Sequence, residues 1–115
     1  MDARLLKALS DPNRLKMIEL LMVHPYCVKA LALRVELSES AISQHLKVLR
    51  EAGLVEGVKY GYYTHYRVNR ELLIELRAQL DALIALTGSG KHRCDLADEV
   101  GCERRRENEG GTSPC

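Results

Sequence analysis

Residues 27–53 read CVKALALRVELSESAISQHLKVLREAG, and this stretch decides the fold class. Its second part predicts a helix over residues 38–52, because apolar residues recur there at the spacing of a helix with one buried face. The apolar positions of that helix are Ile42, Leu46 and Leu49. Ser38 is a suitable N-cap, and Gly53 suits the left-handed backbone that ends a helix. We therefore expect a well-defined helix with one apolar and one polar face.

A shorter helix is expected just before it, over residues 27–35. Its buried side consists of Val28, Leu31 and Ala32. Only a few residues around 35–37 separate the two helices. A helix, a short turn and a second helix are typical of a helix-turn-helix, whose second helix lies in the major groove of DNA.

Polar residues occupy the outward face of the second helix once its apolar stripe is removed. These residues are Ser40, Ser43, Gln44, Lys47 and Arg50. Serine and glutamine side chains reach base edges, whereas Lys47 and Arg50 suit phosphates. An ordinary solvated helix face has a similar composition, so the helix pattern alone leaves both interpretations open.

Two helices are expected before this stretch, over residues 3–9 and 14–23. Asp11 is suited to cap the second of them, and Pro12 suits its first position, where the missing N–H costs nothing.

Residues 54–69 change to a period of two, which predicts a β-hairpin with Gly57 and Gly61 at turns. We expect the even-numbered residues between 58 and 68 on one face of it. A hairpin after a helix-turn-helix forms a wing that reaches the DNA backbone or the minor groove. Polar residues of the hairpin that could contact DNA are Lys59, His65, Arg67 and Arg70. Tyr66 is expected to pack on the helices instead.

The last expected helix covers residues 70–88 and carries a wide apolar stripe. The stripe consists of Leu72, Leu73, Leu76, Leu80, Leu83 and Ile84. One small domain cannot cover a stripe of this width, so the helix is expected to form a dimer interface. The fold class predicted is mainly α with a β-hairpin, a winged helix-turn-helix.

The composition limits the classes of function. The chain has 115 residues and a net charge of +1, so DNA binding requires a local basic patch or an oligomer. No signal peptide and no apolar run of about 20 residues are present, and we expect a cytoplasmic protein without membrane contact. No nucleophile–base pairing, phosphate loop or cofactor fingerprint is visible, so an enzyme is not expected. Residues 1–90 are expected to form the domain and 91–115 a flexible tail that carries cysteines.

Two segments resemble one known family. They are KALSDPNRLKMIELL, residues 7–21, and SESAISQHLKVLREAGLVEGVKYGYYTHYRV, residues 38–68. Both are similar to the ArsR/SmtB winged-helix repressors that respond to metals and metalloids, and the resemblance covers about residues 3–70. It implies a homodimer, joined through the first and last helices, that occupies double-stranded operator DNA and leaves it when an inducer binds.

The resemblance also implies roles for particular residues. It makes 38–52 the recognition helix, with Ser40, Ser43, Gln44 and His45 at the DNA-facing positions. The family often has a basic residue just after the wing glycine, where this chain has Tyr62. Lys59 is expected to substitute for it.

The inducer sites known from the family are incomplete in this sequence. One family site uses two cysteines before the recognition helix, and here Cys27 is present but Lys29 replaces the second thiol. Another uses aspartate and histidine on the last helix, and here residues 70–88 contain Asp81 but no histidine.

The remaining thiols lie in the tail, at Cys94, Cys102 and Cys115. Thiolates prefer soft ions, and three of them suit the pyramidal coordination of arsenite or antimonite, or a soft metal ion such as cadmium or lead. His92 and Cys27 are possible additional ligands. The inducer is therefore expected to bind the tail.

Other interpretations remain open at this stage. The tail thiols are idle in one of them. In another, a repressor of the same fold is released by oxidation, through a disulfide between two tail thiols, or by persulfides. A third interpretation is a winged-helix module that binds a protein and not DNA.

Overall fold

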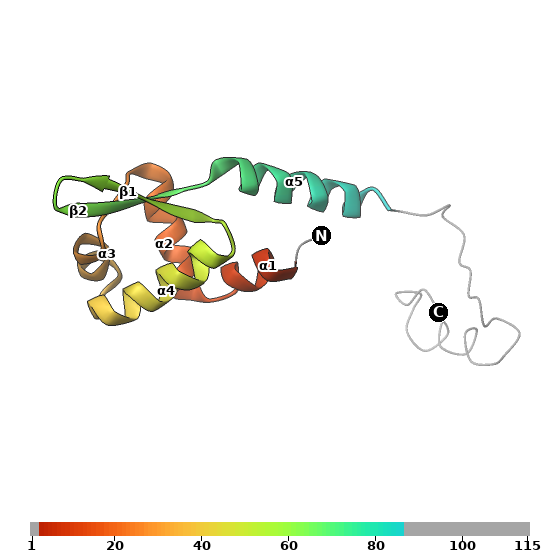
Figure 1. The fold of residues 1–115 in the computed structure, drawn as a ribbon. Helices are drawn as coiled ribbons and strands as arrows, with labels where there is room; N and C mark the ends of the chain where they lie inside the picture. Colours follow the sequence, from red (N-terminus) through yellow and green to blue (C-terminus); the bar gives the residue numbers. More distant parts are fainter. Residues whose placement is uncertain (1–2, 87–115) are drawn as a thin grey trace, which may run out of the picture. The chain divides into compact units, whose positions relative to one another are not determined.

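The computed structural model describes residues 3–86. The chain divides into Met1–Leu83 and Ile84–Cys115, and the fold below is that of the first unit. In chain order its elements are α1 (Ala3–Leu9), α2 (Pro12–Val23), α3 (Val28–Val35), α4 (Glu39–Glu51), β1 (Val55–Tyr60), β2 (Tyr63–Val68) and α5 (Arg70–Ile84) (Figure 1). This order confirms the expected fold, which is mainly α with one β-hairpin. The predicted tail, 91–115, lies outside the described residues.

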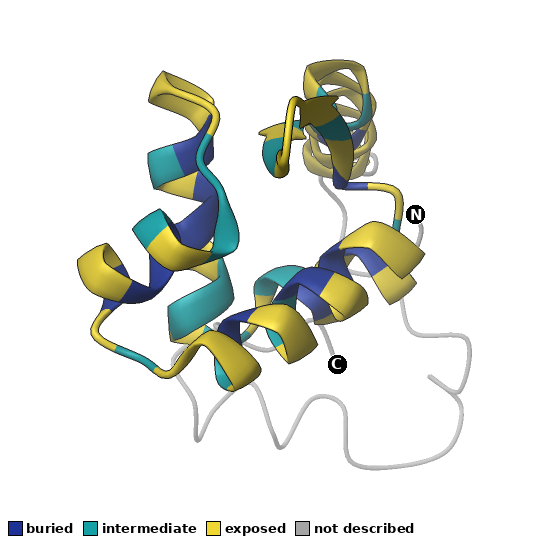
Figure 2. Cartoon of the chain, turned by 60° about the vertical axis from the view of Figure 1, so that its left-hand side comes forward, coloured by how far each residue is buried: buried dark blue, intermediate teal, exposed yellow. Residues whose placement is uncertain are grey.

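One apolar core joins the helices to the base of the hairpin. Its largest fully buried side chains are Met17, Leu31, Ile42, Leu46, Leu49 and Leu54. Three of these lie on α4, and they are the stripe that the sequence predicts (Figure 2). No polar or charged side chain among residues 3–86 is buried, so the core that α4 packs into is entirely apolar.

The start of α2 is fixed by its predicted cap. An oxygen of the Asp11 carboxylate, Oδ1, accepts hydrogen bonds from the amides of Asn13 at 2.8 Å and Arg14 at 3.3 Å. Burial acts to raise the pKa of Asp11, but these hydrogen bonds and the charges of His45 and Arg14 lower the pKa below its ordinary value. The ionised Asp11 carboxylate thus stabilises the fold at pH values above the pKa that it has in the unfolded chain. This stabilisation is lost as the pH falls through its lower pKa in the folded state. The helix begins at Pro12, the first position that this proline indicates, and two residues before the start of the expected range 14–23.

The turn between α3 and α4 contains a residue in the left-handed conformation. Glu36 has a φ of 63°, and its amide donates to the carbonyl of Ala32 at 2.9 Å. The next amide, that of Leu37, donates to the same carbonyl at 3.2 Å, which closes the end of α3. After this turn Ser38 begins α4, where its hydroxyl accepts from the amide of Ala41 at 3.1 Å.

The two strands form an antiparallel pair that we call the wing, in which Val55 lies opposite Val68 and Tyr60 opposite Tyr63. A two-residue turn, Gly61–Tyr62, joins the strands, so every pair matches an odd-numbered residue with an even-numbered one. Residues that pair share a face of the sheet. The prediction of one face built from the even-numbered residues between 58 and 68 is therefore wrong. Each face instead combines the odd-numbered residues of one strand with the even-numbered residues of the other.

The inner face of the wing packs on the helices. Its paired residues are Val55 with Val68, Gly57 with Tyr66, and Lys59 with Thr64. Tyr66 is half-buried against the core, as expected, and its amide donates to the carbonyl of Tyr26 at 2.9 Å. The wing is thereby attached to the segment between α2 and α3.

Gly57 is not at a turn, contrary to the prediction, and lies within β1 opposite Tyr66. A Cβ atom at this position would lie 2.8 Å from Cγ2 of Thr64 and 3.1 Å from Cε1 of Tyr66. The glycine is therefore needed for space, since the Thr64 methyl group and the Tyr66 ring lie too close to admit a side chain.

Replacing Gly57 with alanine is expected to lower the free energy of unfolding by about 1–3 kcal/mol, because the added methyl group displaces neighbours that pack on the core. Urea unfolding followed by circular dichroism measures this loss. The double variant Gly57→Ala/Thr64→Ala should recover part of it, since it removes the nearest clashing atom. A single variant as stable as the wild type would contradict this account of the wing.

The last helix, α5, is mostly uncovered within the chain. Only Leu76 is buried in it, and Leu83 is 55% exposed. The helix ends at Ile84, before the predicted residue 88. No helix between residues 3 and 86 combines the length and the apolar character that a membrane crossing needs.

Candidate nucleic-acid interface

The outward face of α4 has the composition that the sequence predicts. All five of its predicted contact residues are exposed: Ser40, Ser43, Gln44, Lys47 and Arg50. Because the opposite face of the helix is locked into the core, these side chains project together from a rigid element. We call this set the α4 face. It presents hydroxyl and amide groups in its first half and two cations in its second half.

His45 differs from the α4 face, although the resemblance places it among the DNA-facing residues. Its ring is half-buried, and Nδ1 lies 3.4 Å from Nη1 of Arg14 on α2. The imidazole therefore lies at the boundary between α4 and α2.

Arg14 connects three helices, and the sequence reasoning missed it. Its Nε donates to the carbonyl of Ala8 at 2.7 Å, and Nη2 donates to that of Lys7 at 3.4 Å. Nη1 lies 3.9 Å from Oδ2 of Asp11 and also contacts His45. Arg14 thus connects the end of α1 and the N-cap of α2 to His45 on α4. One signal was available, because a cation in the first turn of a helix opposes the helix dipole and so needs partners.

The wing carries the remaining predicted DNA contacts on two different faces. Lys59 is exposed on the inner face, near the tip. Arg67 lies on the outer face, where its Nε donates to Oε1 of Glu56 at 2.7 Å in an exposed ion pair. Tyr62 at the turn is fully exposed. On the outer face the rings of Tyr60 and His65 also lie against each other, tilted by 38°, with centroids 5.0 Å apart.

A shallow cavity of about 370 Å³ separates the start of α3 from the wing. Its lining consists of Cys27, Lys29, Ala30, Leu33, Tyr63 and His65. Cys27 is a free, half-buried thiol at the N-cap position of α3. No group of three or more His, Cys, Asp or Glu side chains between residues 3 and 86 is placed to hold a metal ion. Cys94, Cys102, Cys115 and His92 lie outside the described residues.

Arg70 does not belong to the DNA-facing part of the wing. It is the first residue of α5, and its side chain lines a recess against α2, together with Arg77. The structure thus separates Arg70 from the other polar candidates of the hairpin.

Comparison with known proteins agrees with this geometry. Residues 11–57 match the model of the "Bacterial regulatory protein, arsR family". The chain is 34% identical to the "Arsenical resistance operon repressor" of Staphylococcus xylosus, over 69% of this chain and 76% of that protein. It is 39% identical to the "Transcriptional activator HlyU" of Vibrio cholerae, over 66% of this chain and 73% of that protein.

Solved structures show the same fold. An "ArsR-like Transcriptional Regulator from Rhodococcus sp. RHA1" superposes with a TM-score of 0.69 at 34% identity, over 72% of this chain and 76% of that one. A homodimeric winged helix-turn-helix DNA-binding domain, Mb0332 from Mycobacterium bovis, superposes with a TM-score of 0.60 at 28% identity, over 80% of this chain and 85% of that one.

Proposed function

The chain belongs to the ArsR family of bacterial regulatory proteins, and we propose that it is an operator-binding repressor released by a thiophilic inducer. It is a transcription regulator and not an enzyme. The α4 face carries the proposal of operator binding, because a rigid helix projects hydroxyl, amide and cationic groups from one side of a winged helix-turn-helix.

In the proposed complex α4 lies in the major groove. Ser40, Ser43 and Gln44 then meet base edges, and Lys47 and Arg50 meet phosphates. His45 lies at the edge of this contact, held by Arg14. Lys59 and Arg67 extend it along the wing to the neighbouring backbone.

A homodimer joined through α1 and α5 completes the proposal. Leu6 on α1 and Leu80 on α5 are each 40% exposed, and Leu83 is 55% exposed. A second copy of the chain would cover this apolar surface and place two α4 helices on two half-sites.

We infer that the inducer is arsenite or antimonite, or a soft metal ion such as cadmium or lead, held by Cys94, Cys102 and Cys115. The preference of thiolates for soft ions supports this inference, as does the relative named an arsenical resistance operon repressor. His92 and Cys27 are possible further ligands. Cys27 by itself supplies one thiolate on α3, which is too few for arsenite.

Operator binding is tested by fluorescence anisotropy with a palindromic duplex and a scrambled duplex of equal length, each at two salt concentrations. We expect Gln44→Ala to weaken operator binding by about 1–3 kcal/mol, about 5- to 150-fold, because an amide that reads a base edge is lost. Affinity for the scrambled duplex should stay unchanged.

Lys47→Ala is the matched control for this prediction. Because a phosphate contact carries no sequence information, it should weaken both duplexes equally and reduce the salt dependence. A wild-type protein that binds neither duplex at low salt would contradict the proposed function. A Gln44→Ala variant with wild-type operator affinity would remove Gln44 from the contact.

A further inference from the structure

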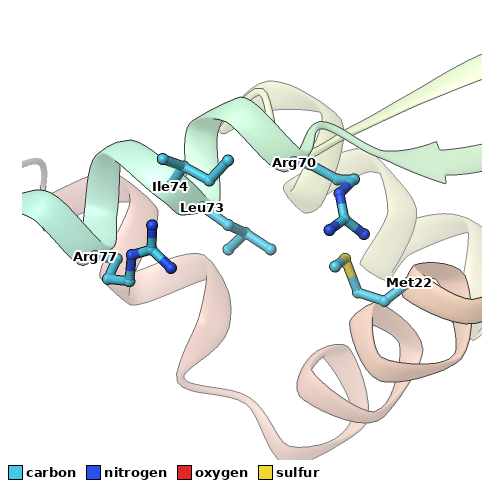
Figure 3. Close-up of a pocket in the computed structure, with 5 residues that line it drawn as sticks. All are labelled: Met22, Arg70, Leu73, Ile74 and Arg77. Carbon is cyan, nitrogen blue, oxygen red and sulfur yellow. The ribbon is translucent and has the colours of Figure 1, made fainter.

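A recess between α2 and α5 lies outside the α4 face and the wing. It has a volume of about 210 Å³ and is lined by Met22 of α2 and by Arg70, Leu73, Ile74 and Arg77 of α5 (Figure 3). The two guanidinium groups stand at its two ends, and apolar side chains lie between them (Figure 3). The recess is thus cationic at both ends and apolar in the middle.

This arrangement follows from the helical repeat. Arg70, Leu73, Ile74 and Arg77 stand at positions i, i+3, i+4 and i+7 of α5, so they share one face of the helix. Two turns separate the arginines, which places their Cα atoms about 10 Å apart along the axis. Met22, near the end of α2, lies at the Arg70 end of the recess, with its thioether beside the Arg70 guanidinium (Figure 3).

Neither arginine is used by the fold. Within residues 3–86 the side chains of Arg70 and Arg77 make no hydrogen bond and no ion pair. Arg67 of the wing, by contrast, is paired with Glu56 at 2.7 Å. Two unpaired guanidinium groups next to an apolar surface favour an organic anion, since guanidinium forms bidentate pairs with groups such as carboxylate.

We propose that this recess binds a small organic dicarboxylate with an apolar middle, and that the bound anion acts as a second effector of the repressor. One carboxylate pairs with Arg70 and the other with Arg77, while the hydrocarbon chain covers Met22, Leu73 and Ile74. The volume is smaller than the roughly 300–1,000 Å³ of pockets that hold drug-sized ligands, which restricts the ligand to a short chain.

The position of Arg70 connects the recess to the DNA-binding elements. The preceding residue, Asn69, donates its amide to the carbonyl of Leu54 at 2.8 Å and its side-chain Nδ2 to the carbonyl of Gly53 at 3.3 Å. Gly53 directly follows the end of α4. A ligand that pairs with both arginines and also covers Met22 would therefore link α5 to α2, close to the end of α4. This effector role rests on the proposed function, whereas binding of the anion does not.

Isothermal titration of the full chain with octanedioate tests the site. Octanoate, with one carboxylate, and octanamide, with none, are the matched probes. We expect octanedioate to bind about five- to tenfold more tightly than octanoate, because it forms a second ion pair with an exposed arginine. The titration is made at low ionic strength, since salt weakens such exposed pairs. Octanamide should bind most weakly of the three.

Variants distinguish the recess from general attraction of anions. Arg70→Gln and Arg77→Gln should each reduce octanedioate to the affinity of octanoate, while Lys16→Gln, on the exposed side of α2, should change nothing. Equal affinity for the three probes would overturn the proposed site. An equal loss of octanedioate affinity in all three variants would overturn it as well. Arginine variants that weaken the dimer and leave octanedioate binding unchanged overturn it too, because the arginines then serve the second copy.

The effector role has its own readout. Octanedioate should shift the operator affinity of the wild type and not that of Arg77→Gln. Binding of octanedioate without a shift overturns the effector role. Failure of the repressor proposal is seen separately, as an absence of operator binding before any probe is added.

Discussion

In the Cys94→Ser and Cys102→Ser variants, arsenite is expected to leave the protein on its operator at concentrations that release the wild type. Arsenite bound to three thiolates loses a third of its ligands when one cysteine becomes serine, and a hydroxyl is a poor ligand for a soft ion. Because a ligand shifts an equilibrium only through a difference in affinity between two states, weaker binding removes release. Operator affinity without arsenite should equal that of the wild type.

Fluorescence anisotropy of labelled operator, titrated with arsenite, measures release, and a thiol assay on the same samples counts the free cysteines. Cys27→Ser is the matched control, since this thiol lies at the start of α3 and is not part of the tail sequence. It should respond like the wild type, and a lost response would place Cys27 in the ligand set. Release of both tail variants at the wild-type arsenite concentration would contradict the tail site.

The same assay separates the redox alternative. If an oxidant such as hydrogen peroxide releases the wild type while arsenite does not, and the thiol count falls by two, the tail senses oxidation by forming a disulfide. The two variants would then lose the response to oxidant.

Replacing Leu49 with alanine is expected to lower the free energy of unfolding by about 2–5 kcal/mol. Leu49 has 0% of its surface exposed and belongs to the stripe that seats α4 in the core. The substitution removes apolar contact and leaves a cavity, because the surrounding helices relax only in part. Small domains have a total stability of about 5–15 kcal/mol, so a large share of it would be lost.

Urea unfolding measures the loss, and Leu33→Ala is the control. It makes the same chemical change on α3, where Leu33 is 73% exposed, and should alter stability by less than about 0.5 kcal/mol. Equal effects of the two substitutions would contradict the core described here. Operator binding by Leu49→Ala should fall in proportion to the fraction of protein that is folded.

Local patterns allowed much of the fold to be predicted. The stripe of Ile42, Leu46 and Leu49 and the caps at Asp11 and Ser38 depend on residues within one or two helical turns, so the sequence displays them directly. The outward residues of α4 then follow as the complement of the buried stripe.

Features that depend on distant residues were not predictable in the same way. The two faces of the wing were misassigned because a two-residue turn couples odd and even positions, which a single run of alternating residues does not reveal. The contact between Arg14 and His45 joins residues 31 positions apart. The recess at Met22 needs the end of α2 next to the first two turns of α5, and only the tertiary structure brings them together.

The two-residue turn also limits how the wing can vary among relatives. Inserting or deleting one residue at Gly61–Tyr62 would exchange the faces of β2, so that Tyr66 would leave Gly57 and the core. Changes of length in this hairpin are therefore tolerated in pairs, whereas single substitutions at the fully exposed Tyr62 are free of this constraint. Evolution and protein engineering alike should adjust the wing by exchanging its tip residue rather than by altering its length.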